Sequence, residues 1–143
     1  MSRTWFWVII ISVLTLNYGV AEATDQNDAT NAATSILQSI HGHQFEKLWN
    51  VQTSQWFKEK TTEDSFIANL SLGAQQVGAA QDSKLVDISY SRSDPATGFV
   101  GEIYACTYLT TYSVGKFYER VVVLKENDGK FRLSGLWGSP ASQ

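Results

Sequence analysis

The feature that most constrains this chain is a change of hydrophobic period near residue 81. Between residues 28 and 77, apolar side chains recur at the three- and four-residue spacing of helices that bury one face. After the polar stretch Gln81-Asp82-Ser83 the period becomes two, which is typical of strands that bury one face. Helices followed by consecutive strands predict an α+β fold.

The first half of the chain predicts three helices. The first covers residues 28–41 and is followed by Gly42, a natural helix stop. The second covers about residues 44–58. The third opens with the capping-box pattern Thr61-Thr62-Glu63-Asp64 and continues to residue 77.

The second half predicts about four strands in a curved antiparallel sheet. They are expected near residues 86–91 and over 99–112, 116–125 and 130–137, with a turn at 94–98. We therefore expect three helices packed on this sheet, in a single α+β domain of residues 24–143.

Two turns predict which strand residues share a face. Reading Asn127-Asp128-Gly129 as a three-residue hairpin loop places Glu119 near Trp137, and reading Ser113-Val114-Gly115 the same way pairs Tyr112 with Lys116. The face expected to meet the helices then carries Ile103, Ala105, Thr107, Leu109, Phe117, Glu119, Val121, Val123, Phe131, Leu133 and Trp137. The other face carries Tyr104, Cys106, Tyr108, Tyr112, Tyr118, Arg120, Val122 and Leu124. An error of one residue in either turn exchanges the two sets on one strand.

Glu119 is the charged residue on the face expected to meet the helices. A buried carboxylate must be paired, hydrogen-bonded or exposed to a wet cavity, because burying it alone is prohibitive. One interpretation is a structural hydrogen bond; the other is a ligand pocket between helices and sheet. The candidate pocket residues are Trp49, Thr107, Glu119 and Trp137. No motif specifies a reaction, so catalysis stays open, and we favour a non-enzymatic role.

Tyrosines dominate the other predicted face. The candidate interface residues are Tyr104, Tyr108, Tyr112, Tyr118 and Arg120. Tyrosine and arginine are enriched at protein interfaces, which favours a non-catalytic interaction module that forms a homodimer or binds a periplasmic protein. The alternative is the ordinary preference of tyrosine for strands.

Charge and motif content argue against several classes of function. A net charge of −3 without clustered Lys or Arg argues against nucleic-acid binding. His41 and His43 flank Gly42, but no further His or Cys has ligand spacing, so a solvated helix end is expected rather than a metal site. No glycine pattern cradles phosphate, and we expect no cofactor. The lone cysteine, Cys106, is read as a small buried hydrophobe rather than a reactive thiol.

The first 23 residues have the pattern of a cleaved signal peptide. Arg3 precedes an apolar run over residues 5–16, and Ala21-Glu22-Ala23 offers a small-residue cleavage site. The run is shorter than the roughly 20 residues that span a bilayer, although an uncleaved signal anchor is the alternative. We expect a periplasmic or secreted protein that begins at Thr24 and has no stable membrane anchor after cleavage.

Residues 32–137 resemble the bacterial domain of unknown function 4019 family. The resemblance rests on Trp49-Asn50-Val51-Gln52-Thr53-Ser54-Gln55-Trp56-Phe57, on the Leu72-Gly73 step, and on Asp128-Gly129-Lys130-Phe131-Arg132-Leu133-Ser134-Gly135-Leu136. The order of elements also resembles the cone of nuclear transport factor 2-like proteins. That resemblance implies an enzyme with a polar residue deep in the cone, a non-enzymatic ligand binder or a module that dimerises through the sheet, and leaves the choice open.

Overall fold

The chain has an α+β fold in which helices precede a four-stranded antiparallel sheet. A computed structural model describes residues 12–95 and 97–142. The helical elements are α1 (Ser12–His41), α2 (Phe45–Lys47), the π-helical segment η1 (Leu48–Gln52), α3 (Gln55–Lys58) and α4 (Glu63–Val77). The strands are β1 (Ala80–Asp94), β2 (Phe99–Tyr112), β3 (Gly115–Lys125) and β4 (Phe131–Pro140). The α+β class and the order of helices before strands are confirmed.

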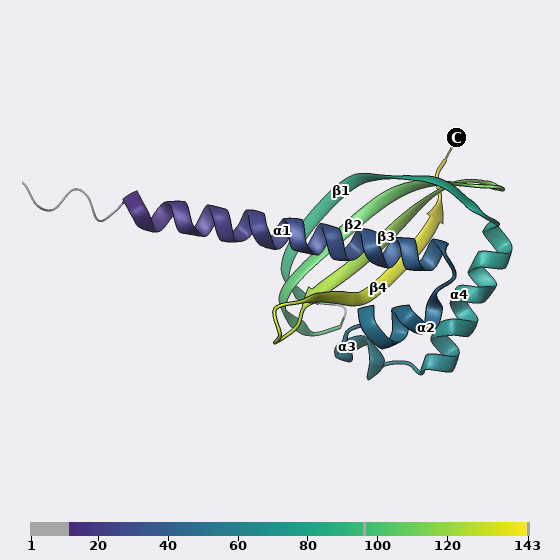
Figure 1. Ribbon diagram of the computed structural model, residues 1–143, viewed down its shortest axis with the longest axis horizontal. Coiled ribbons are helices and arrows are strands. Elements are labelled where there is room, and N and C mark those ends of the chain that lie inside the picture. Colours follow the sequence, from purple (N-terminus) through teal and green to yellow (C-terminus); the bar gives the residue numbers. More distant parts are fainter. Residues whose placement is uncertain (1–11, 96, 143) are drawn as a thin grey trace, which may run out of the picture.

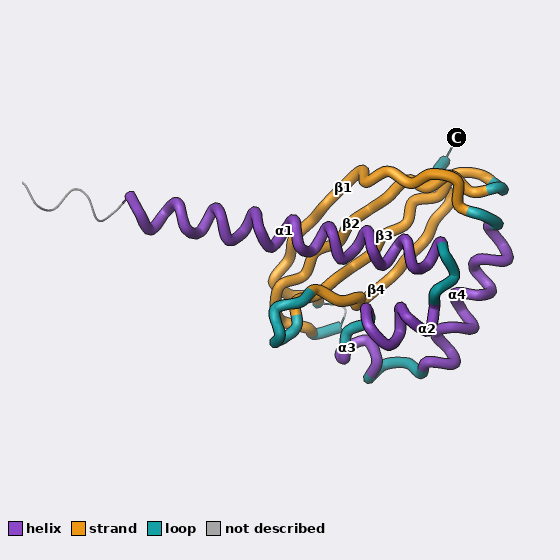
Figure 2. The backbone as a smooth tube through the Cα atoms, viewed as in Figure 1, coloured by secondary structure: helices purple, strands orange, loops and turns teal. Residues whose placement is uncertain are grey.

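The sheet is a meander in which each strand pairs with its neighbour in the order β1-β2-β3-β4. Helix α1 crosses one face of this curved sheet, which we call the inner face, and the opposite face is the outer face (Figures 1 and 2). Small residues on α1, Ala29 and Ala33, are fully buried and let the helix approach the sheet closely. Ile36 and Leu37 complete the buried stripe, and burying each contributes roughly 1.5–3 kcal/mol.

The inner face of the sheet supplies the other half of the core. Its buried residues are Tyr104, Cys106, Tyr108, Val121, Val123, Phe131 and Leu133. Cys106 is buried as expected, and Leu133, Val121 and Val123 have no exposed surface. The middle of the inner face is therefore filled.

The second expected helix is broken rather than continuous. Thr53 has an extended backbone and forms an isolated bridge with Leu133 of β4. The Ser54 N–H donates to the Leu133 carbonyl at 2.9 Å, and the Ser54 hydroxyl caps α3 by accepting from the Phe57 N–H at 3.2 Å. Backbone pairing with β4 competes with helix formation here, and so the prediction of one helix over residues 44–58 is wrong.

The third expected helix begins as predicted. Thr62 is the residue before α4, and its hydroxyl accepts from the Ser65 N–H at 3.3 Å. The helix ends at Gly78, which has a positive φ of 77°. Glycine at this position allows the chain to turn into β1.

The hairpin between β2 and β3 has a shorter loop than expected. Tyr112 pairs with Gly115, so the loop is Ser113-Val114, and Tyr108 rather than Leu109 lies opposite Glu119. This shift of one residue exchanges the two faces of β2. Ile103, Ala105, Thr107 and Leu109 lie on the outer face, and Tyr104, Cys106, Tyr108 and Tyr112 on the inner face. The face assignment predicted for β2 is wrong.

The loop between β3 and β4 is as predicted, but a β-bulge follows it. The Glu126 N–H bonds to the Lys130 carbonyl, and Val123 pairs with Leu133 as expected. Val122 then pairs with Gly135, which leaves Ser134 as the extra residue of β4. The bulge turns Leu136 inward and Trp137 outward, opposite Arg120. Trp137 is 59% exposed, and the prediction that it packs under the helices is wrong.

Helix α1 extends past the sheet at its N-terminal end (Figure 1). Ala29 is its first buried residue among those whose side chains are described. No described helix is long and apolar enough to span a membrane. Residues 1–11 of the predicted signal peptide lie outside the described residues.

Candidate functional site

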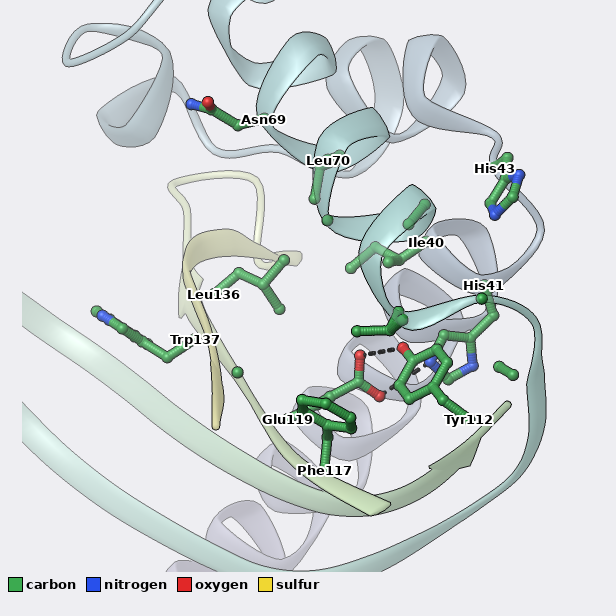
Figure 3. A pocket seen from close by; sticks show the side chains of 16 residues that line it. Ile40, His41, His43, Asn69, Leu70, Tyr112, Phe117, Glu119, Leu136 and Trp137 are labelled. Atoms are coloured by element: carbon green, nitrogen blue, oxygen red, sulfur yellow. Dashed lines mark hydrogen bonds and ion pairs between the residues drawn. The ribbon is translucent and has the colours of Figure 1, made fainter. Parts of the chain in front are cut away.

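A pocket lies where α1 ends and α4 takes over as the cover of the sheet. Its volume is about 170 Å³. Most of its wall is apolar and comes from Ile40, Leu70, Ala74, Val77, Phe117 and Leu136. Figure 3 shows these walls around a polar base formed by His41, Tyr112 and Glu119.

Three elements bring the polar base together. Glu119 points inward from β3, Tyr112 is the last residue of β2, and His41 is the last residue of α1. The Tyr112 hydroxyl donates to Glu119 Oε1 at 2.5 Å, and His41 Nε2 lies 2.9 Å from Glu119 Oε2. The rings of His41 and Tyr112 meet edge to face, with centroids 5.6 Å apart. Each carboxylate oxygen therefore has a side-chain partner, and we call this group the His–Glu–Tyr cluster.

The environment keeps Glu119 ionised although only 8% of the residue is exposed. Burial raises the pKa of Glu119, but hydrogen bonds from His41, Thr110 and Tyr112 lower it by more than burial raises it. The pKa of Glu119 therefore lies below its ordinary value. Thr110 is held in turn by the Ser83 hydroxyl at 2.9 Å. Burial also raises the pKa of Tyr112, and acceptance by Glu119 adds to that increase. Tyr112 thus stays a protonated donor beside a carboxylate.

The cluster has spare acceptor capacity and little spare donor capacity at its centre. Since Tyr112 donates its hydroxyl hydrogen to Glu119, its oxygen keeps a lone pair for another donor. The carboxylate oxygens likewise accept more than one bond each. Among the described residues, no Lys or Arg lines the pocket. The arrangement therefore suits an O–H or N–H donor and disfavours an anion.

Metal ligation has no support in the described part of the chain. Residues 12–95 and 97–142 contain no group of three or more His, Cys, Asp or Glu that could hold a metal ion. His43, which has a positive φ of 55°, lies at the pocket edge and contacts Phe45 with ring centroids 5.6 Å apart.

Gly73 in α4 opens the pocket wall. It lies inside a 15-residue helix, where glycine costs about 1 kcal/mol relative to alanine. A Cβ atom built at Gly73 would meet no heavy atom of the described residues within 4 Å. The helix therefore has room for a side chain that it lacks, and the missing side chain adds to the cavity.

The predicted pocket residues are only partly brought together. Glu119 lies at the base, while Trp137 on β4 borders the rim and its side chain points away from the cluster (Figure 3). Trp49 lies in the core against Phe66, with centroids 5.3 Å apart. Thr107 lies on the outer face. Grouping Trp49 and Thr107 with Glu119 is contradicted by these positions.

The predicted interface residues are divided between the two faces. Tyr104 and Tyr108 belong to the core and Tyr112 to the pocket, whereas Tyr118 and Arg120 are exposed on the outer face. The prediction that all five share one exposed face is therefore wrong. The cause is the one-residue shift between β2 and β3.

Sequence reasoning missed His41 and Tyr112 as partners of Glu119. His41 was expected to be a solvated helix end, but it closes the cluster. A two-residue reading of the β2–β3 loop would have placed Tyr112 on the face that carries Glu119. No local signal in the sequence links His41 to Glu119, because the two residues are 78 positions apart.

An α+β domain with a small pocket between its helices and its sheet is the class that this fold and site define. Residues 32–136 match the family described as "Protein of unknown function (DUF4019)". The chain belongs to this family. No curated protein and no solved structure was found to match the chain.

Proposed function

We propose that the pocket binds a small molecule with an apolar body and one hydrogen-bond donor group. The observation that carries this proposal is Gly73 of α4. It contributes no side chain to the wall of an apolar pocket that has a charged base. A helix that served only to close the core would be more stable with alanine at this position. The Leu72-Gly73 step of the family resemblance is therefore the step that opens the pocket.

The size and lining of the pocket favour a ligand of about one ring. A cavity of roughly 150 Å³ holds benzene in another protein, and this pocket has about 170 Å³. The apolar walls accept the ring, and the Tyr112 and Glu119 oxygens accept its donor group. Phenols, cyclic alcohols and neutral amines fit this description, and carboxylates do not.

The test is titration with phenol, followed by the amide resonances of the pocket residues. We expect a Kd of roughly 0.1–1 mM. The corresponding binding free energy per heavy atom of phenol is below the ceiling of about 1.5 kcal/mol. Benzoate should bind at least ten times more weakly, because its carboxylate would face Glu119. Equal or tighter binding of benzoate would contradict the proposed ligand class.

Gly73→Leu is the variant that fills the pocket. The new side chain has open space and should abolish phenol binding while the far-ultraviolet circular dichroism stays unchanged. Leu72→Ala is the matched control, since Leu72 is the neighbouring residue of α4, is 55% exposed and does not line the pocket. If Gly73→Leu binds phenol like the wild type, the pocket is not the site.

Export is proposed with this function. The pattern of residues 1–23 supports a cleaved signal, and the projection of α1 past the sheet supports a cleavage that leaves the core intact (Figure 1). The protein would then be periplasmic or secreted, with Thr24 as its first residue. The mass of protein recovered from the periplasm of an expressing bacterium tests this; a full-length mass would refute cleavage.

A nuclear transport factor 2-like cone is the finer architecture that we propose. The helices over a curved sheet and the polar cluster inside support it. Dimerisation through a tyrosine face becomes the second candidate function, because only Tyr118 and Arg120 of its five predicted residues are exposed.

A further inference from the structure

The outer face of the sheet presents an exposed tryptophan in an unusual setting. The bulge at Ser134 turns Trp137 outward, and the indole lies over Gly135. A Cβ atom at Gly135 would lie 2.5 Å from Trp137 Cη2 and 2.6 Å from Cζ3, so only glycine permits this position. Bulges often re-aim a side chain, and a strand glycine often marks a close approach. The bulge at Ser134 and the glycine at position 135 therefore both position the exposed Trp137 ring.

A hollow lies beside this ring. Its volume is about 570 Å³, within the roughly 300–1,000 Å³ of small-molecule sites. Its floor is low because paired residues of neighbouring strands are small: Ser89 of β1 pairs with Ala105 of β2, and Ala105 with Val122 of β3. Val122 pairs in turn with Gly135 of β4. The hollow therefore crosses the sheet between β1 and Trp137.

Polar groups around the hollow are available to a ligand. Arg120 pairs with Trp137 across the strands, yet its guanidinium forms no hydrogen bond or ion pair with any described residue. The Ser89 hydroxyl is likewise without a hydrogen bond within the described ranges. Asp94 accepts from the Thr97 hydroxyl at 2.8 Å and borders the far side. The Trp137 indole therefore lies next to the Arg120 guanidinium and near the Ser89 hydroxyl, neither of which has a hydrogen-bond partner among the described residues.

We propose that this hollow binds a carbohydrate that carries a carboxylate. The C–H groups on one side of a pyranose ring have partial positive charge and stack on the negative face of an indole. The Arg120 guanidinium matches a carboxylate in a bidentate geometry, and the Ser89 hydroxyl can donate to or accept from a sugar hydroxyl. A purely apolar partner would leave Arg120 unpaired on burial, which is costly.

The test is titration of the protein with trigalacturonic acid and with maltotriose, a neutral trisaccharide. The readout is the ¹⁵N–¹H indole resonance of Trp137, identified by its absence in Trp137→Phe. We expect trigalacturonic acid to shift this resonance and to bind at least ten times more tightly than maltotriose. No shift with either sugar at millimolar concentration overturns the proposal.

Variants separate the two contributions. Trp137→Ala should abolish sugar binding, and Arg120→Gln should lower the affinity for trigalacturonic acid about tenfold and remove the preference over maltotriose. Tyr118→Ala is the matched control, since Tyr118 is 43% exposed on the same face but does not line the hollow. If Tyr118→Ala weakens binding as much as Trp137→Ala, the hollow is not the site.

Sedimentation of the sugar-free protein tests the competing use of this surface. We expect the mass of a monomer in both the wild type and Trp137→Ala. A wild-type dimer that Trp137→Ala dissociates would show that a second copy of the chain covers the hollow, and would overturn the carbohydrate proposal.

Discussion

Tyr108 and Tyr112 lie on the same strand and the same face, yet they have different tasks. Both are buried, at 4% and 8% exposure, and burial raises the pKa of each. The Tyr108 hydroxyl shares a 2.9 Å hydrogen bond with the Thr34 hydroxyl of α1. The Tyr112 hydroxyl donates to the Glu119 carboxylate beside a cavity. At Tyr108 the inner face is therefore packed against α1 through an uncharged hydrogen bond. At Tyr112 it contains a charged carboxylate next to a cavity.

The covering helices account for this difference. Over Tyr108 the sheet is covered by α1, whose buried residues belong to the same core. Helix α1 stops at His41, and the chain turns away through Gly42 and His43. Beyond that point α4 provides the cover, and its Gly73 contributes no side chain. A pocket forms because one helix ends before the sheet does.

The largest expected effect is on the free energy of unfolding, and it differs between alanine variants of two leucines on β4. Leu133 is fully buried in the core, whereas Leu136 lines the pocket and is partly buried. Leu133→Ala should lower the free energy of unfolding by about 3–4 kcal/mol, since such truncations leave a cavity in packed surroundings. Leu136→Ala should cost about 1 kcal/mol, because one side of that residue already faces space. Urea unfolding measures both, and equal costs would show that the pocket end is packed like the core.

A smaller effect is expected at the two tyrosines. Tyr112→Phe removes a donor to a buried carboxylate and should cost about 2 kcal/mol. Tyr108→Phe removes a bond between neutral hydroxyls and should cost about 1 kcal/mol. Only Tyr112→Phe should also weaken phenol binding. A similar loss of phenol binding in Tyr108→Phe would mean that the two ends of the inner face are not distinct.

Local rules predicted the order of the elements and some of their ends, although α1 starts earlier than the expected residue 28 and β1 starts earlier than the expected residue 86. The change of period near residue 81 marks the start of β1 at Ala80, and the Thr62 cap starts α4. The Asn127-Asp128-Gly129 loop gave the pairing of Val123 with Leu133. These features depend on neighbours in the sequence, and so the sequence carries them directly.

The candidate site was harder to predict because it depends on register and on distant contacts. A loop of two residues instead of three moved Tyr112 to the inner face, and the bulge at Ser134 moved Trp137 to the outer face. Each is a shift of one residue, and each reverses which way a side chain points. Glu119 was found because a charge in an apolar alternation must have a partner, whichever partner that is.

The smallest expected effect is a difference in acid sensitivity at Glu119. Burial raises the pKa of Glu119, but the hydrogen bonds to His41, Thr110 and Tyr112 outweigh burial, so the pKa lies below its ordinary value. An unfolded glutamate has a pKa of about 4.3. Because the folded pKa is lower, the stability contributed by ionised Glu119 is fully present above about pH 4.3 and is lost as the pH falls through the folded value.

Glu119→Gln measures this contribution. At neutral pH the variant should be less stable than the wild type, since a carboxamide cannot accept from both Tyr112 and His41 without presenting an N–H to one of them. Urea midpoints from about pH 7 to about pH 3 should show this gap narrowing at the acid end. Asp128, whose pKa Arg132 holds at about 2, is present in both proteins and cancels in the comparison. A gap that stays constant with pH would mean that the charge on Glu119 does not stabilise the pocket end of the sheet.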